Sequence, residues 1–511
     1  MQSSGSRFCH IVLASLISLV PLLGSCYPLL IQEQSFAGED PVEKDYAGKE
    51  RLEFSAIRAT NSSSYPVDAV LLAENDACVV YGDYNAKVTV STAKEIAQEY
   101  AGRIGPCITE VFGDYYHPKN KKLVILLLDI IDGYDFTKDT TYVAGYFSMK
   151  DIFPKTLLSN SNEAPMLYID INPGKPGDVN FYSTIAHELQ HLINFSSRYR
   201  GKESETENIK TSQEFYALIE SVQQDEWVDE GLSSAAEYIY NKAIGGNEKG
   251  YGHIEKKLDY YNNARQYSNA GQSRIIEGNN FFTWGENDSH IYDDYVTVYL
   301  FFQWLRIQAD NDTSIYRSII ESEYGDYRAV TAAAREHIPG LFDGIDSTDD
   351  QTEELERLLE SWLAANYINA PKKENAGGIF GYDGEITLNP VMLDGTSTWL
   401  YPGEGVYSKL DGKIFDYPMN SPAHIRYAGL SRTEETLLHI TQGNSGTGNA
   451  LLTFNANHTV TMTAAGTPTG PTELGTLAST EPASAEPSPS GRAAGIPAKP
   501  FPIDIRPPLQ F

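Results

Sequence analysis

The longest uninterrupted apolar run between residues 75 and 172 lies within the segment KLVILLLD at residues 122–129. A continuous apolar run of this length is typical of a strand buried on both faces of a sheet. Shorter strand candidates lie at residues 78–81, 142–149 and 166–171. The pattern therefore predicts a mixed sheet over about residues 75–172, ended by the Pro and Gly residues at 173–177.

Helical spacing of apolar residues dominates the chain after a predicted helix start near Val179. Further helices are predicted at residues 211–224, 228–243, 293–308, 327–337 and 352–367. The pairs Thr92/Glu95 and Thr211/Glu214 have the spacing of a capping box, which predicts a helix start at each pair. Pro106 is expected to break or restart the first of these two helices.

The chain is expected to contain other segments besides its main domain at 71–370. Residues 27–70 are largely polar and charged, which favours a flexible tether. A small β-rich region is predicted at 375–462 from its Gly, Thr and short alternating runs. Residues 463–511 are rich in Pro, Ala, Ser and Thr and are expected to be disordered.

Residues 1–26 have the features of an export signal. Arg7 precedes an apolar run at 11–23 that is too short to span a bilayer comfortably. The following Leu23-Gly24-Ser25-Cys26 resembles a bacterial lipobox, which implies cleavage before Cys26, lipidation of that cysteine and an extracytoplasmic, membrane-anchored protein. A plain cleaved signal peptide, with Cys26 a bystander, is the alternative.

The charge balance argues against nucleic acid as a partner. The chain has 39 basic and 69 acidic residues, a formal net charge of −30 that would repel a phosphate backbone. Outside the signal and Cys26, only Cys78 and Cys107 remain, and the sequence leaves open whether they pair or are two free thiols. No C-x-x-C pair occurs, so cysteine is not expected to supply metal ligands.

The predicted helix after Val179 contains the pattern H-E-x-x-H. His187 and His191 lie one turn apart on the same helix face, where both imidazoles can bind one metal ion. Glu188 follows the first ligand and can reach a metal-bound water without binding the metal, which is the position that a general base needs. The rest of the helix is buried by the apolar residues Ile185, Leu189, Leu192 and Ile193.

A catalytic zinc site usually has three protein ligands and one open position, and a carboxylate from a second helix commonly completes it. We expect Glu230 to be this third ligand, within the segment EWVDEGLSSAAEY at residues 226–238. Glu237 and Asp229 are both candidates for a hydrogen bond to the imidazole nitrogen that does not bind the metal.

The segment from Trp227 to Glu237 resembles the W-x-x-E-G-x-x-x-x-x-E pattern of gluzincin metallopeptidases. Within that clan the chain most resembles the hyicolysin family of secreted bacterial metallopeptidases. The matching segments lie at 144–151, 168–170, 186–195 and 226–238, and the resemblance spans roughly residues 75–310. It implies one Zn²⁺ ion in an α+β, zincin-like fold with an N-terminal mixed sheet, an active-site helix and a mainly helical second lobe.

A zinc peptidase also benefits from a hydrogen-bond donor that stabilises the oxyanion formed during attack on the carbonyl. Tyr295 is our first candidate because it lies at the start of an apolar helix, and His290 and Tyr292 are the alternatives.

The sequence thus predicts a zinc-dependent peptidase that hydrolyses extracellular proteins or peptides. The main alternative is a surface-displayed binding protein or adhesin that keeps a zinc-stabilised fold without turnover. Glu188 argues against that alternative, because a structural zinc site needs no base beside the metal. A zinc hydrolase acting on a non-peptide bond is a third interpretation, since the same chemistry serves other carbonyl groups.

Overall fold

The computed structural model describes residues 45–392, apart from gaps at 87, 136, 138–141, 207, 247–251, 278–280, 282–283, 285–289 and 370–380, and strand segments between 397 and 504. The chain divides into two compact units, residues 1–254 and 255–511, and each is described by itself. The predicted export signal and Cys26 lie outside the described residues.

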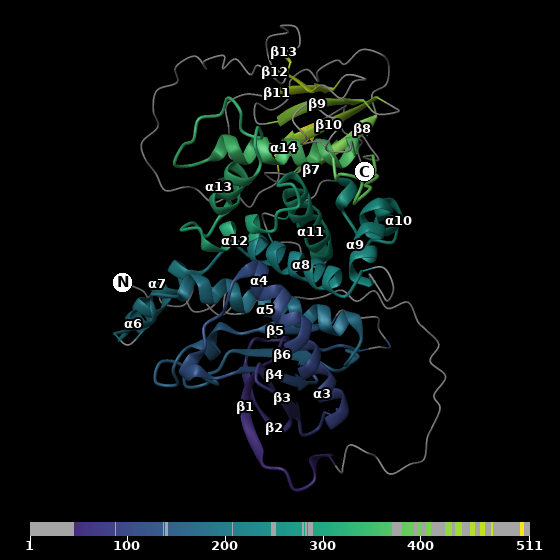
Figure 1. Ribbon diagram of the computed structural model, residues 1–511. Coiled ribbons are helices and arrows are strands. Elements are labelled where there is room, and N and C mark those ends of the chain that lie inside the picture. Colours follow the sequence, from purple (N-terminus) through teal and green to yellow (C-terminus); the bar gives the residue numbers. More distant parts are fainter. Residues whose placement is uncertain are drawn as a thin grey trace, which may run out of the picture. The chain divides into compact units, whose positions relative to one another are not determined.

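The first unit is built on a six-stranded sheet in the order β1-β2-β3-β4-β6-β5 (Figure 1). Its strands are β1 (Arg51–Ile57), β2 (Ser64–Glu74), β3 (Cys78–Asp83), β4 (Leu123–Leu128), β5 (Gly145–Phe147) and β6 (Met166–Asp170). The central strands β3, β4 and β6 are parallel, whereas β1, β2 and β5 pair antiparallel with their neighbours. Strands β1 and β5 therefore form the two edges of this mixed sheet.

The predicted tether at 27–70 is wrong for residues 51–57 and 64–70, which form β1 and most of β2. The end of β1 reaches the core, where Ala56 and Ile57 are buried and Phe54 packs against them, whereas Leu52 is exposed. The charged residues Arg51 and Glu53 at the start of the strand are exposed. Period-two alternation over so short a segment is a weak signal beside a high local charge.

Two helices, α3 (Val90–Glu99) and α5 (Val179–Tyr199), cover the same face of the sheet. On this face Cys78 contacts the Ala97 carbonyl of α3, and the position of Gly145 is packed against Thr184 of α5. Cys78 and Gly145 lie on the same face of the sheet. The register shows this, because Cys78 is opposite Leu123, Ile125 is opposite Leu167, and Ile169 is opposite Gly145, and residues two apart in a strand share a face. The helix α5, which carries the H-E-x-x-H pattern, thus packs against the β5 edge.

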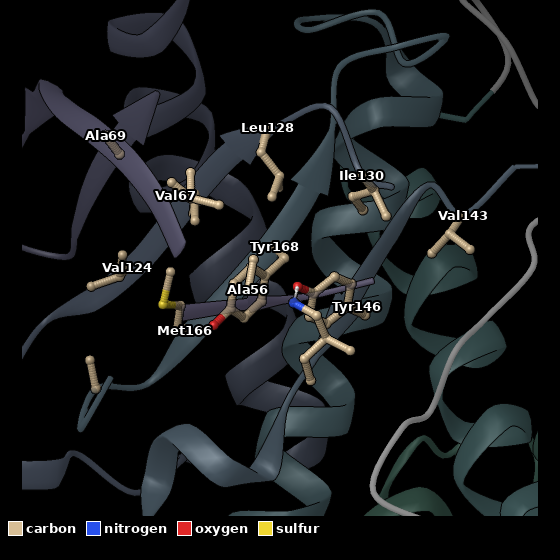
Figure 2. Close-up of a cluster of buried hydrophobic side chains, with 13 residues drawn as sticks. Ala56, Val67, Ala69, Val124, Leu128, Ile130, Val143, Tyr146, Met166 and Tyr168 are labelled. Atoms are coloured by element: carbon tan, nitrogen blue, oxygen red, sulfur yellow. Dashed lines mark hydrogen bonds between the residues drawn. The ribbon is translucent and has the colours of Figure 1, made fainter. Parts of the chain in front are cut away.

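The opposite face of the sheet carries a buried cluster that includes Ala56, Val67, Leu126, Met166 and Tyr168. Figure 2 shows the ring of Tyr146 beside that of Tyr168 within this cluster. The two rings are stacked, with centroids 4.3 Å apart and planes 13° apart.

Side chains, rather than another strand, satisfy the outer edge of β1. The Ile57 N–H donates to the Tyr146 hydroxyl at 2.8 Å, and the Ser55 N–H donates to the Asn162 amide oxygen at 2.9 Å. The Ser55 carbonyl accepts from Lys150 and Tyr168. An edge covered in this way is not available to pair with another chain.

The helix starts agree only in part with the capping patterns. Thr211 and Glu214 form the predicted capping box of α7 (Ser212–Val222). The Thr92/Glu95 prediction is wrong, because the Thr89 side chain accepts from the Thr92 N–H and α3 starts at Val90. A π-helical turn at Tyr100–Ile104 separates α3 from α4 (Gly105–Phe112), which has Pro106 in its first turn.

The remaining helices of the first unit are α6 (Glu203–Thr206) and α8 (Glu226–Ala243). Among the described residues of this unit, the buried Cys78 and the half-buried Cys107 are free thiols.

The second unit contains helices and two sheets. Its helices are α9 (Gly252–Asn262, which starts just before the unit boundary), α10 (Ala264–Asn269), α11 (Ile291–Gln308), α12 (Ser314–Glu321), α13 (Tyr327–His337) and α14 (Thr352–Ile368). A six-stranded sheet has the order β13-β12-β11-β9-β10-β8, and β7 pairs with β14. Their bounds are β7 (Ser397–Leu400), β8 (Gly405–Lys409), β9 (Ile425–Ser431), β10 (Glu435–Thr441), β11 (Ala450–Phe454), β12 (Val460–Ala464), β13 (Thr472–Glu473) and β14 (Phe501–Asp504).

Two features differ from the predicted domain limits. The boundary between the units at 254/255 falls inside the range 71–370 that we assigned to one domain. Strands β13 and β14 fall inside 463–511, so the prediction of disorder does not hold for these six residues, whose backbones pair with β12 and β7. Among the described residues, no helix is long and apolar enough to cross a membrane.

The contact between β1 and Tyr146 predicts a measurable loss of stability. Tyr146→Phe leaves the buried Ile57 N–H without an acceptor, so we expect the free energy of unfolding to fall by about 1–3 kcal/mol. Chemical denaturation measures this change. Tyr65→Phe, on a half-buried ring of β2, is the control and should change stability by less than about 0.5 kcal/mol. Equal effects of the two substitutions would contradict the proposed importance of the β1 edge.

Asp151 predicts a pH dependence of stability. It is fully buried and accepts from the Tyr168 hydroxyl and the Asn162 N–H, each at 2.7 Å, and burial raises its pKa to about 6. Because the folded chain then binds this proton more tightly than the unfolded chain, the Asp151 contribution to stability falls as pH rises from about 4 to about 6.

Asp151→Asn does not titrate, so its free energy of unfolding relative to wild type should increase by about 1–3 kcal/mol between pH 4 and pH 7. Denaturation curves at both pH values measure this difference. Asp114→Asn, whose side chain is 70% exposed, is the control, and its difference from wild type should change less between the two pH values than that of Asp151→Asn. A pH-independent difference for Asp151→Asn would refute the prediction.

Candidate metal centre

The two histidines of the H-E-x-x-H pattern lie on α5, next to β5 in Figure 1. The helix begins after Asp178, whose side chain accepts from the Phe181 N–H at 2.8 Å. His187 and His191 are 0% and 1% exposed, and their ring centroids are 4.8 Å apart. The spacing of four residues thus brings both rings to one side of the helix, as the sequence predicts.

Helix α8 packs against α5 in the antiparallel direction and supplies Glu230. The Glu230 Oε2 atom lies 3.2 Å from His187 Nε2 and 3.7 Å from His191 Nε2. One potential ligand atom from each of the three residues lies within 4.8 Å of the others, and all three side chains are buried. The structure therefore brings together the three residues that the sequence predicts as metal ligands.

Each imidazole is held through its other nitrogen. His187 Nδ1 is 2.9 Å from Glu237 Oε1, and His191 Nδ1 is 2.8 Å from Asp229 Oδ2. The sequence offered Glu237 and Asp229 as alternatives, and in the structure each contacts a different histidine. Such contacts leave Nε2 of each ring to face a metal ion.

Sequence reasoning missed two residues that surround His191. The Ser233 hydroxyl lies 3.0 Å from His191 Nδ1, and the Asn194 amide donates to Asp229 and to Gln224. Their positions carried a signal, because Asn194 is three residues after His191 and Ser233 three residues after Glu230. Residues three apart on a helix share a face.

The electrostatics of the site favour a positive charge between the two helices. Burial lowers the pKa of His187, but the carboxylates of Glu230 and Glu237 outweigh it and raise that pKa to about 10. Burial likewise lowers the pKa of His191, and Asp229 and Glu230 raise it to about 9. A divalent cation can supply the positive charge that protons on these rings otherwise provide.

The hydrogen bonding and the spacing of the three candidate ligand atoms also fit a metal ion. His187 Nε2, His191 Nε2 and Glu230 Oε2 are buried and have no partner with hydrogen-bond geometry among the described residues. A tetrahedral ion with bonds of about 2.0–2.2 Å separates its ligand atoms by about 3.3–3.6 Å. The distances of 3.2 and 3.7 Å from Glu230 to the two histidines are close to this separation.

Glu188 is fully buried between the metal-binding residues and β5. Burial raises the pKa of its carboxyl group to about 7, although His187 and His191 act in the opposite direction. The backbone N–H of Phe147 also lowers this pKa. A carboxyl group with a pKa near neutrality is suited to accept and return a proton.

Tyr295 is on α11 in the second unit, where it is 1% exposed and its ring meets that of Trp284 edge-on at 4.8 Å. Tyr292 packs against Tyr260, and His290 is the N-cap residue of the same helix. The role of Tyr295, or of either alternative, as an oxyanion donor stays a prediction.

The buried triad invites comparison with known metal-dependent enzymes. The chain is similar to a metalloprotease. The neutral metalloprotease ShpI of Staphylococcus hyicus is 26% identical over 313 residues, which are 60% of this chain and 58% of ShpI. The chain thus spans less than two thirds of the length of this curated relative. No family model matches the chain.

Together with this similarity, the mixed sheet and the many helices confirm the predicted α+β, zincin-like fold. The arrangement of His187, His191 and Glu230 fits a metal ion in that fold.

The contact between Asp229 and His191 predicts that the affinity for a metal ion depends on Asp229. Asp229→Asn removes the charge that holds His191 Nδ1, so we expect the affinity for Zn²⁺ to fall about 10- to 100-fold. Competition with a chelator measures this affinity without reference to activity. Asp68→Asn, at an exposed position on β2, is the matched control and should leave the affinity unchanged. An unchanged affinity in Asp229→Asn would show that this carboxylate does not support the site.

Proposed function

We propose that this chain is a zinc-dependent peptidase that hydrolyses proteins or peptides. The observation that carries the proposal is that the side chains of His187, His191 and Glu230 lie close together in the interior, beside a fully buried Glu188. Three protein ligands leave one position for water or substrate, whereas a structural site is usually closed by four. The name of the similar protein, a neutral metalloprotease, supports the same activity.

Zinc is the ion that best suits this site. Two imidazole nitrogens and one carboxylate form a ligand set found in catalytic zinc sites. The H-E-x-x-H pattern followed by Glu230 supports the proposal that the chain belongs with the gluzincins, and the segments at 144–151, 168–170 and 186–195 favour the hyicolysin-like family.

Each residue of the site has a separate role in the proposed hydrolysis. Bound zinc would polarise the substrate carbonyl and make water more acidic. Glu188 accepts a proton from the attacking water at its carboxylate and delivers it to the leaving amine as the C–N bond breaks. Asp229, Ser233 and Glu237 keep both imidazoles in the orientation that binding requires. Tyr295 stays the predicted oxyanion donor, with His290 and Tyr292 as the alternatives.

The β5 edge is the proposed place for an extended substrate. Side chains already satisfy the β1 edge, whereas β5 pairs on one side with β6 and has no second strand partner in the described part of the sheet. A substrate that adds to β5 as a further strand would lie next to Glu188.

We further propose that the protein acts outside the cytoplasm. The signal-like residues 1–26 support export, and the lipobox resemblance supports lipid anchoring through Cys26. Extracellular proteins or peptides would then be its substrates.

The first test is to measure zinc content and casein cleavage for the purified protein and for Glu188→Gln. We expect one zinc ion in both proteins and a loss of at least about 100-fold in kcat in the variant, because the proton acceptor is lost. A chelator should abolish the wild-type activity.

One zinc ion in both proteins without cleavage of any protein or peptide would favour the binding-protein alternative. Cleavage that survives Glu188→Gln would refute Glu188 as the base. The absence of zinc from the wild type would refute the metal assignment.

A further inference from the structure

Gly145 lies in unusually close contact with the helix that carries Glu188. A Cβ atom at this position would meet Thr184 Cγ2 at 2.8 Å, the Tyr168 carbonyl oxygen at 3.0 Å and Glu188 Cγ at 3.2 Å. Contacts this short require a neighbour to move. The strand can therefore approach the helix at this point only because residue 145 has no side chain.

Two of the three neighbours cannot move easily. Thr184 is β-branched, and its hydroxyl donates to the Asn180 carbonyl at 3.1 Å, which restricts its rotamer. The Tyr168 carbonyl belongs to β6, where Tyr168 pairs with Tyr146 of β5. The Glu188 side chain is the flexible neighbour and would be displaced first.

On the face of β5 that points away from α5, the side chain of Tyr146 makes contacts that hold the strand in place. The Tyr146 hydroxyl accepts from the Ile57 N–H at 2.8 Å, and its ring is stacked on Tyr168. These contacts oppose any movement of β5 away from α5. A side chain at residue 145 would consequently displace Glu188 rather than the strand.

We propose that Gly145 is a positioning residue that sets the location of the Glu188 carboxylate. The inference rests on the proposed function, because it takes Glu188 to be the general base. It differs from a role in substrate pairing, which uses the backbone of β5 and would be expressed in KM. A positioning role is expressed in kcat, because a base displaced by a fraction of an ångström transfers protons poorly.

The test compares Gly145→Ala, Thr184→Ser and the double variant in the full chain loaded with zinc. Gly145→Ala should lower kcat about 10- to 100-fold with little change in KM and with one zinc ion still bound. Thr184→Ser removes the Cγ2 atom of the shortest contact and keeps the hydroxyl, so alone it should change kcat by less than about twofold. The double variant should recover kcat at least about fivefold over Gly145→Ala.

Gly102→Ala is the matched control, because an added Cβ atom meets nothing within 4 Å there. Its kcat and KM should equal those of wild type. If Gly145→Ala does not fold, the double variant is compared with Thr184→Ser. The kcat of the double variant should then be lower than that of Thr184→Ser, by less than the loss expected for Gly145→Ala alone. The melting temperature measures the contact between residue 145 and Thr184 independently of activity. It should be lower in Gly145→Ala than in wild type, and higher in the double variant than in Gly145→Ala.

An active wild type whose kcat is unchanged by Gly145→Ala would overturn the inference, as would a rise in KM alone or a double variant no better than Gly145→Ala. A zinc-loaded wild type without activity overturns the proposed function instead. The two failures are thus separated by the wild-type measurement.

Discussion

The candidate site depends on the packing of α5 against α8, which buries carboxylates next to two imidazoles. Glu230 faces the Nε2 atoms, and Asp229 and Glu237 hold the Nδ1 atoms. Without positive charge between the helices, the buried carboxylates of Glu230 and Glu237 would be energetically costly. The packing therefore favours positive charge at this place, supplied by protons on the imidazoles or by a bound cation, and His187, His191 and Glu230 are all buried.

The sheet supports this site in a less direct way. Its β1 edge is covered by side chains from the far edge of the same sheet and from the loops nearby, including Tyr146 and Asn162. This covering holds β5 from one face, while α5 holds it from the other. An edge strand held from both faces can present its backbone to a substrate at a constant distance from Glu188.

The sequence predicted local features well and boundaries less well. The buried strand β4 and the H-E-x-x-H helix follow from patterns that extend over adjacent residues. The tether prediction failed at β1 because strands distant in sequence bury Ala56 and Ile57, and a high content of charged residues does not reveal such contacts. The helix start at Thr92 failed because Thr89, three residues earlier, offered the same capping chemistry.

By itself the sequence determined that His187, Glu188 and His191 share one stretch of helix, because the helical period depends only on local backbone geometry. It also marked Glu230 as the candidate third ligand. Only the tertiary structure decided that Asp229 and Glu237 each hold a different histidine, that Ser233 contacts His191, and that the side of Gly145 where a Cβ atom would stand faces Glu188. These contacts join segments tens of residues apart, and their distances arise from how helices and strands pack, which no local pattern encodes.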